Sequence, residues 1–197
     1  MENNSLAVFD FDGTLIKSDS FLEFIRFYKG VRNFYFGILL WSPLLVLMKA
    51  RLLSNSRIKQ YVLSYFFEGE NIKYFNSRGD EFARRCIPRM LNPEAMEKLH
   101  WHLREGHKVL IISASAENWI KAWSDLFRVE LIATKLEVKN NLLTGSISGS
   151  NCYGIEKLRR LREHVDLSAY SEIFVYGDSK GDKEILSIAT DPFYRKF

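Results

Sequence analysis

The chain has 197 residues, a formal net charge of +4, 47% hydrophobic residues and 26% charged residues. This composition is typical of one globular domain, or of one domain with an inserted lobe, and it excludes wholesale disorder. Two cysteines are too few for a disulfide framework or a four-thiolate zinc site. Residues 1–10 lack the basic and apolar segments of a signal peptide, so we expect a cytoplasmic protein.

The first predicted element is a short apolar strand at residues 6–10, and the sequence DFDGT follows at residues 10–14. Residues two apart in an extended segment point the same way, so Asp10 and Asp12 should project together. Two such charges are costly unless a cation or a shared proton relieves them. The pair is therefore a candidate metal or acid–base site, and the alternative is an ordinary turn with a helix cap.

The next segment, residues 17–91, is predicted to be mostly helical, with apolar residues at helical spacing around Phe24. Its charge differs from that of the rest of the chain. Residues 17–101 contain 14 Lys and Arg against 8 Asp and Glu, a balance of +6, and the remainder contains 14 against 16, a balance of −2. Half of the 28 aromatic residues lie between Phe21 and Phe75. The chain thus divides into an acidic body and a basic, aromatic insert.

The insert contains an uncharged apolar run, residues 34–48, with basic residues on both sides. The run is shorter than the roughly 20 residues that a membrane-spanning helix needs, and Pro43 should kink or interrupt a helix. Basic flanks favour peripheral contact with an anionic bilayer face. The alternative is a buried core helix of the insert. A nucleic-acid-binding face is not expected, because it would interleave aromatic and charged residues.

The remaining elements alternate between strands and helices, which predicts a parallel sheet covered on both faces. The predicted helices span residues 93–105, 116–127, 154–164 and 180–188. The predicted strands span residues 108–113, 131–134 and 173–176, with a hairpin around Asn140-Asn141. We expect His100, His102 and His107 to be exposed to solvent. For the tail at 193–197 we leave two alternatives, packing on the core or contact with a membrane.

Polar residues follow several of these strands, at the edge where parallel sheets place functional groups. Ser113 ends one strand, Asp178 ends another, and Asp182 lies one helical turn after Asp178. Clustered carboxylates suit Mg²⁺, which takes one or two of them together with substrate phosphate. Lys157, near a helix start, could add a positive charge. Taken alone, each residue has an ordinary explanation as a helix cap, a loop residue or a solvated charge.

Together these motifs resemble the haloacid dehalogenase superfamily, over nearly the whole chain. The first motif is matched by DFDGTL at residues 10–15, the second by Ser113, the third by Lys157 and the fourth by GDSKGD at residues 177–182. Further glycines between Leu143 and Lys157 resemble the phosphoserine-phosphatase-like branch. The resemblance implies a Rossmann-like α/β core at residues 1–16 and 101–197, with an all-helical cap inserted at residues 17–100.

The resemblance also implies a mechanism and a role for each matched residue. Asp10 would be the nucleophile that forms an aspartyl-phosphate, and Asp12 would be the general acid and base. The dehalogenase members lack an aspartate at that second position, so we expect a phosphatase. The implied Mg²⁺ ligands are Asp10, Asp178 and the backbone carbonyl of Asp12. The other implied roles are phosphate binding for Thr14, Ser113 and Lys157, close backbone approach for Gly13, and support of the metal or of Lys157 for Asp182.

The substrate is the open part of this interpretation. Asp19 lies where the phosphoserine branch has a glutamate in its cap, and Gly181 replaces an asparagine of the fourth motif, so phosphoserine is disfavoured. The cap is similar to that of the phosphatidylglycerophosphatase C type, which implies a lipid phosphate and peripheral contact at the inner face of the cell membrane through residues 34–48. The alternatives are a soluble phosphatase of a small metabolite and a non-catalytic binding protein with this fold.

Overall fold

The computed structural model of the chain describes residues 4–49 and 55–197, with the side chains of 41–56 outside the described part. Its centre is a five-stranded sheet in which all neighbouring strands are parallel. In spatial order the strands are β3 (Glu130–Thr134), β2 (Lys108–Ala116), β1 (Ser5–Phe9), β6 (Glu172–Gly177) and β7 (Asp191–Tyr194). The predicted α/β class with a Rossmann-like parallel sheet is thereby confirmed.

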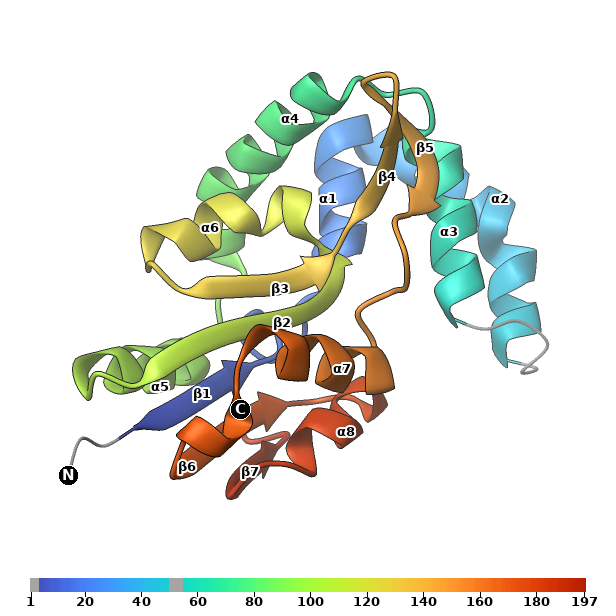
Figure 1. The fold of residues 1–197 in the computed structure, drawn as a ribbon. Helices are drawn as coiled ribbons and strands as arrows, with labels where there is room; N and C mark the ends of the chain where they lie inside the picture. Colours follow the sequence, from blue (N-terminus) through green and yellow to red (C-terminus); the bar gives the residue numbers. More distant parts are fainter. Residues whose placement is uncertain (1–3, 50–54) are drawn as a thin grey trace.

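Helices cover both faces of this sheet (Figure 1). They are α5 (Pro93–Arg104) and α6 (Lys121–Leu126) on one face, and α7 (Ile155–His164) and α8 (Lys183–Leu186) on the other. Because strand residues alternate between faces, Ala7 and Phe9 pack with Leu99 of α5, whereas Leu6 and Val8 pack with Leu158 of α7. The sheet is therefore buried on both sides, as a parallel sheet requires.

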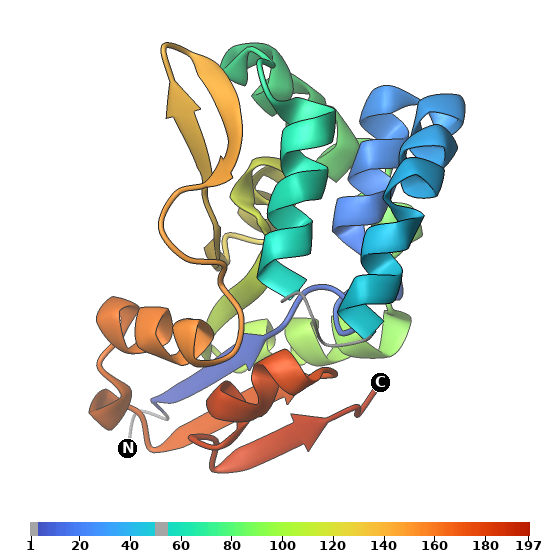
Figure 2. The same cartoon turned by 90° about the vertical axis from the view of Figure 1, so that its right-hand side faces the viewer.

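Four further helices lie beyond the carboxyl ends of the strands (Figures 1 and 2). They are α1 (Ser20–Lys29), α2 (Val31–Lys49), α3 (Asn55–Phe67) and α4 (Ile72–Arg85). An antiparallel hairpin, β4 (Leu136–Lys139) and β5 (Leu142–Ile147), packs beside α3. The approach is close at Gly145, where a Cβ atom would lie 2.4 Å from the Cα of Ser64. The helical layer thus contacts the β4–β5 hairpin, which the sequence analysis assigned to the core and not to the cap at residues 17–100. The exact domain limits stay a prediction.

The helical layer has an aromatic interior and, on α2, exposed apolar side chains. Phe24 of α1 is fully buried and stacks on Trp119 at a centroid distance of 4.8 Å. In contrast, Phe36 and Leu39 of α2 are 65% and 72% exposed. The α2 backbone continues past Pro43, so of the predicted kink or interruption the interruption is not observed, and the kink stays a prediction. Among the described residues, no helix combines the length and the hydropathy needed to span a bilayer. The part of the apolar run at 41–48 has no described side chains.

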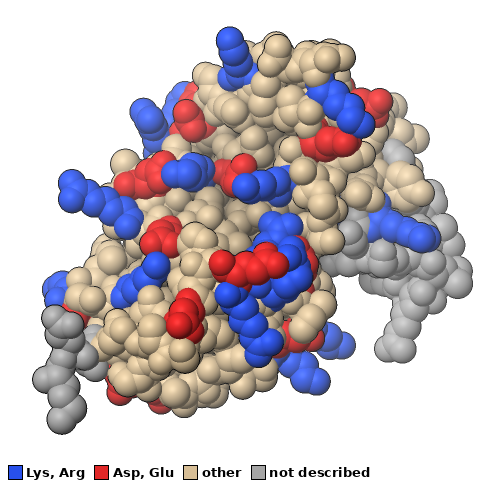
Figure 3. Space-filling model, viewed as in Figure 1, with Lys and Arg blue, Asp and Glu red and all other residues tan. Residues whose placement is uncertain are grey.

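The surface drawn in Figure 3 carries charges of both signs, with basic side chains interspersed among acidic ones. On α7, for example, Arg159 forms ion pairs with both Glu156 and Glu163. Such a face differs from the single-sign basic surface that attracts a nucleic-acid backbone. The net positive charge of the chain is therefore not gathered into one basic patch on this face.

Several predicted elements differ from those in the structure. Strand β2 continues to Ala116, because its last residues still pair with β3 across a register shift. The helix predicted at 116–127 is instead a 3₁₀ turn at Glu117–Trp119 followed by α6, and the one predicted at 180–188 is a 3₁₀ turn at Lys180–Asp182 followed by α8. Asn92 precedes α5 as predicted, but its side chain does not cap the helix.

The first two residues of the tail, Phe193 and Tyr194, belong to the strand β7 (Asp191–Tyr194), which the sequence analysis did not predict. Phe193 stacks on Tyr176 at a centroid distance of 4.6 Å, and Phe197 stacks on the same ring at 5.5 Å. Of the two alternatives for this segment, packing on the core is therefore the one observed. The hairpin turn at Asn140-Asn141 is confirmed, with φ values of 51° and 63° that asparagine tolerates better than most residues.

The expected exposure of the histidines is wrong for two of the three. His102 is fully buried and His107 is 6% exposed. Their Nδ1 atoms lie 2.8 Å apart, and His102 Nε2 lies 2.9 Å from the hydroxyl of Tyr176. The physical reason is helical spacing, since α5 turns His102 toward the sheet on the same side as the buried Leu99. Burial, together with the charges of His107 and Lys98, lowers the pKa of His102 to about 3.

This burial predicts a pH dependence of stability. Below pH 6.5 the unfolded chain protonates His102, whereas the folded chain resists protonation down to about pH 3. The free energy of unfolding should therefore fall as the pH drops through this window, by up to about 1.4 kcal/mol per pH unit. In His102→Gln the decline should be shallower when measured by urea unfolding, and in the exposed control His100→Gln it should match the wild type. Equal slopes in all three proteins would contradict the assignment.

Candidate active site

The site is built around the turn that follows β1. Every residue of β1 is buried, and the backbone N–H of Asp10 still donates to the carbonyl of Tyr176 on β6 at 2.8 Å. Phe11 points the opposite way and is buried against Trp123 at a centroid distance of 5.4 Å. The N–H of Ile16 returns to the Phe11 carbonyl at 3.0 Å and closes the turn. The alternation brings Asp10 and Asp12 to the same cavity, as the sequence predicted.

Asp10 belongs to a buried three-residue charge cluster with Lys157 and Asp182. The ammonium of Lys157 lies 2.7 Å from Asp10 Oδ1 and 2.6 Å from Asp182 Oδ1, and the lysine is only 2% exposed. Although burial lowers the pKa of Lys157, the two carboxylates outweigh that effect and raise it. Burial raises the pKa of Asp182, but the charge and hydrogen bond of Lys157, together with the hydrogen bonds from Ser179, lower it by more. The net shift of the Asp182 pKa is therefore downward. Lys157 is therefore held as a cation beside Asp10.

The same place has the donor set of a hard cation site. Carboxylate oxygens of Asp10, Asp178 and Asp182 all lie within 4.8 Å of one another. Asp178 Oδ1 is buried and has no hydrogen-bond partner in the described part of the chain. Lys157 offsets only one of the three negative charges, and burial together with the charge of Asp182 raises the pKa of Asp10 to about 8 despite Lys157. An unpartnered buried oxygen and surplus negative charge fit a divalent cation such as Mg²⁺.

Close backbone approach makes this cluster possible. A Cβ atom on Gly13, whose φ is +77°, would lie 2.3 Å from Asp178 Oδ2. A Cβ atom on Gly177 would lie 2.6 Å from the Cβ of Asp182. Asp182 is held from its other side by a capping box, in which Ser179 N donates to Asp182 Oδ2 at 3.0 Å. Glycine at 13 and 177 therefore gives the carboxylates room that a side chain would fill.

Asp12 faces the same cavity but has a separate set of partners. Its Oδ2 accepts a hydrogen bond from the Ser115 hydroxyl at 2.6 Å, and its Oδ1 accepts one from the Ser20 N–H at 2.6 Å. Burial and the charge of Asp19 raise the pKa of Asp12, against the lowering by these hydrogen bonds. Its carboxylate lies outside the three-aspartate group. The predicted contribution of its backbone carbonyl to a metal site stays a prediction.

The residues predicted to bind phosphate have polar atoms available. Ser113 is fully buried, and its oxygen accepts the backbone N–H of Ser115 at 3.0 Å, which leaves the hydroxyl proton free to donate elsewhere. Thr14 is 2% exposed, and its hydroxyl has no partner among the described residues. Buried polar groups normally have partners, so the unpartnered hydroxyl of Thr14, four residues after Asp10, is compatible with the predicted binding of an anion.

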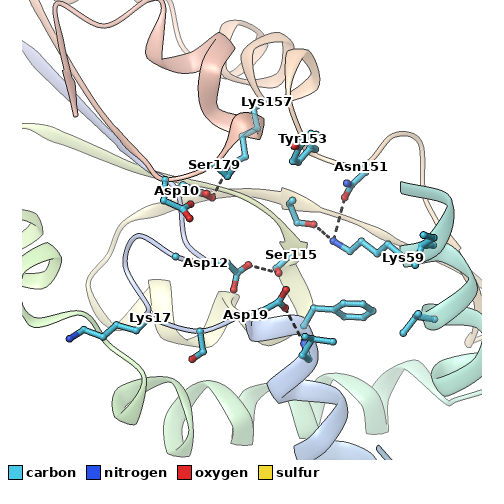
Figure 4. Close-up of a pocket in the computed structure, with 18 of the residues that line it drawn as sticks. Asp10, Asp12, Lys17, Asp19, Lys59, Ser115, Asn151, Tyr153, Lys157 and Ser179 are labelled. Carbon is cyan, nitrogen blue, oxygen red and sulfur yellow. Dashed lines mark hydrogen bonds and ion pairs between the residues drawn. The ribbon is translucent and has the colours of Figure 1, made fainter. Parts of the chain in front are cut away.

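The cavity lined by Asp10, Asp12 and Lys157 has a volume of about 780 Å³ and is shown in Figure 4, and neither Thr14 nor Ser113 is among its lining residues. Its floor is charged, whereas its far wall is apolar and comes from the helical layer. The wall residues are Phe21 and Leu22 of α1, Phe34 and Ile38 of α2, and Ile58 and Val62 of α3. Asp19, predicted as a specificity residue of the cap domain, also lines the cavity. It is the N-terminal capping residue of α1, because its side chain accepts a hydrogen bond from the Leu22 N–H at 3.1 Å.

One cavity residue that the sequence analysis did not single out is Lys59 of α3. Its ammonium donates to the carbonyl of Ala114 and lies 3.4 Å from Asn151 Oδ1. Within the described part of the chain, no carboxylate forms an ion pair with it, and burial lowers its pKa to about 8. A lysine on a basic helix usually reads as a solvated charge, so no sequence signal distinguishes it. What identifies Lys59 as a cavity residue is its hydrogen bond to Ala114 of β2, the strand that also contains Ser113.

Comparisons with known proteins agree with this geometry. The family model of haloacid dehalogenase-like hydrolases matches residues 7–187. Protein CicA of Caulobacter vibrioides is 32% identical over 200 residues, which cover 98% of this chain and 86% of that protein. A histidinol-phosphatase of Neisseria meningitidis is 25% identical over 214 residues, with coverage of 95% and 88%.

Solved structures show the same fold at lower sequence identity. A Bordetella pertussis protein described as of unknown function superposes with a TM-score of 0.82 at 23% identity, covering 96% of this chain and 89% of that one. A phosphoserine phosphohydrolase-like protein from Francisella tularensis gives a TM-score of 0.69 at 16% identity, with coverage of 96% and 85%. The fold is thus that of the phosphoserine-phosphatase-like structures, as the motif pattern suggested.

The charge cluster predicts a large effect of Lys157→Met on stability. Loss of the ammonium leaves Asp10 and Asp182 buried without their cation, and breaking a buried pair in this way costs about 3–5 kcal/mol. Urea unfolding at neutral pH measures the loss. The matched control is Lys180→Met, an exposed lysine near the same site, which should change the free energy of unfolding by less than about 0.5 kcal/mol. Equal stability of the two variants would contradict the assignment.

Proposed function

Because the chain belongs to the haloacid dehalogenase-like hydrolase family, we propose that it is a Mg²⁺-dependent phosphomonoester hydrolase with Asp10 as its nucleophile. The observation that best supports the proposal is that the carboxylates of Asp10 and Asp12 have different partners. Asp10 is paired with Lys157 beside the candidate metal site, whereas Asp12 faces the same cavity with its own hydroxyl and amide partners. Two carboxylates in different environments can perform different roles.

In the first step Asp10 attacks phosphorus and forms an aspartyl-phosphate, while Asp12 gives a proton to the leaving oxygen. Both described hydrogen bonds to the Asp10 carboxylate, from Lys157 and from the Phe11 N–H, use Oδ1. This leaves Oδ2 for the attack. In the second step Asp12 removes a proton from the water that releases phosphate. The Lys157 ammonium and the hydroxyls of Thr14 and Ser113 bind the phosphate oxygens, and Lys157 is itself oriented by Asp182.

When bound, Mg²⁺ would be held by Asp10, Asp178 and the backbone carbonyl of Asp12, and it would offset the negative charge of nucleophile and phosphate. The unpartnered Asp178 oxygen supports this ligand set. Asp182 has both carboxylate oxygens in hydrogen bonds to Lys157 and Ser179, which favours a supporting role over direct ligation.

For the substrate we favour a phosphate with an apolar body, such as the lipid phosphatidylglycerophosphate. The apolar cavity wall supports this choice, since a small polar metabolite would leave most of a 780 Å³ cavity unfilled. The exposed apolar side of α2 would then contact the inner face of the cell membrane. The alternative is a soluble metabolite phosphatase, which the resemblance to a histidinol-phosphatase favours.

The nucleophile assignment predicts that Asp10→Asn abolishes hydrolysis. The amide cannot form the aspartyl-phosphate, so activity on p-nitrophenyl phosphate with Mg²⁺ should fall by at least about 10³-fold. Circular dichroism should show an unchanged fold, and Asp166→Asn, on an exposed turn away from the cavity, should keep wild-type activity. Retention of activity by Asp10→Asn would overturn the proposed chemistry.

The membrane proposal predicts co-sedimentation with anionic vesicles. Replacing Phe36 and Leu39 together by Asp should abolish it, because two charges would enter the exposed apolar side of α2. The matched control is Leu126→Asp on α6, where the leucine is 64% exposed on a different surface. Absence of vesicle binding by the wild type, with rapid turnover of one soluble phosphate, would favour the metabolite alternative.

A further inference from the structure

A chain of three hydrogen bonds runs from the core of the molecule to Asp12. The indole Nε1 of Trp119 donates to Ser20 Oγ at 3.1 Å, Ser20 Oγ lies 3.0 Å from Ser115 Oγ, and Ser115 Oγ donates to Asp12 Oδ2 at 2.6 Å. Trp119 and Ser20 are fully buried, and Ser115 is 3% exposed. Water therefore does not compete for these hydroxyl groups, and each must find its partners within the protein.

When Asp12 is ionised, the direction of donation along this chain is fixed by its two ends. An indole N–H can only donate, and an ionised carboxylate can only accept. Each serine hydroxyl has one proton. The Ser115 proton must point at Asp12, because otherwise two oxygen lone pairs would face each other at 2.6 Å. Ser115 can then accept the proton of Ser20, whose own oxygen accepts from Trp119. Every group in the chain is satisfied by this single arrangement.

A second contact holds the other oxygen of Asp12, because the Ser20 N–H donates to Oδ1 at 2.6 Å. The two contacts come from different parts of the fold, Ser115 from β2 and Ser20 from the first turn of α1. Together they prevent rotation of the carboxyl group about its Cβ–Cγ bond. Each oxygen keeps a lone pair that neither serine uses, on a carboxyl group that lines the cavity.

We propose that Ser115 is a positioning residue for proton transfer by Asp12, with its own hydroxyl oriented by Ser20 and Trp119. The proposal rests on the proposed function, in which Asp12 is the general acid and base. In the first step the proton passes from Asp12 to the leaving oxygen as the phosphorus–oxygen bond breaks and the bond from Asp10 to phosphorus forms. In the second step Asp12 takes a proton from water, whose oxygen bonds to phosphorus as Asp10 is released.

Fixing the carboxyl group matters only when the leaving group needs a proton. An alkoxide needs one, whereas p-nitrophenolate leaves readily without it. The value of kcat/KM reports the steps up to the first bond cleavage, so hydrolysis of the aspartyl-phosphate does not affect it. Ser115→Ala should therefore lower kcat/KM for hexyl phosphate on the order of tenfold to a hundredfold, part of the effect of general acid catalysis. It should change kcat/KM for p-nitrophenyl phosphate less than about threefold.

Two further variants separate positioning from simple structural support. Ser115→Cys keeps the size of the side chain but donates only a weak hydrogen bond, so it should behave like Ser115→Ala. It replaces Ser115→Ala in the comparison if the alanine variant does not fold. Ser115→Thr keeps the hydroxyl and should recover hexyl phosphate activity. Equal losses on both substrates, or no loss on either, would overturn the positioning role. Inactivity of the wild type on both substrates with Mg²⁺ would overturn the proposed function itself, and the positioning role with it.

Discussion

The surplus of buried negative charge at the carboxyl edge of the sheet is the constraint on which the rest of this structure depends. Three carboxylates meet within 4.8 Å, and one ammonium, that of Lys157, is paired with two of them. Such a cluster persists only if each oxygen has a partner or a cation to bind. The capping box around Asp182, the full burial of Lys157 and the glycine at position 13 all serve that requirement. The oxygen of Asp178 that lacks a partner is where the proposed divalent cation would bind.

Asp12 lies two residues from Asp10, but its carboxylate does not belong to the same cluster. The turn after β1 sends Asp12 toward Ser115 and Ser20, and its hydrogen bonds come from neutral donors. This difference separates a carboxylate held by a cation, suited to attack, from one held by hydroxyl and amide groups, suited to exchange a proton. The roles that we propose for Asp10 and Asp12 rest on these different partners and not on the residue type.

Much of the fold and of the site could be predicted from the sequence, because the strands are apolar and two of the clustered carboxylates, Asp10 and Asp178, directly follow a strand. The sheet brings Asp10 and Asp178 to one cavity, whereas Ser113, predicted to end a strand, lies within β2. A position after a strand does not identify residues placed by packing between distant segments. Lys59 belongs to a basic helix, and only its contact with Ala114 shows that it lines the cavity. His102 is buried because α5 turns it against Phe9, which composition does not reveal.

The placement of Ser20 connects the helical layer to the chemistry. Ser20 is the first residue of α1, so the backbone amide that holds Asp12 belongs to the same helix whose Phe21 and Leu22 line the apolar wall. Ser115 holds the other oxygen from the sheet. Asp12 is therefore oriented only while α1 and β2 keep their present separation, and the stacking of Phe24 of α1 on Trp119 maintains it. The wall that would contact the body of a substrate and the group that would protonate it are thus parts of one packed unit.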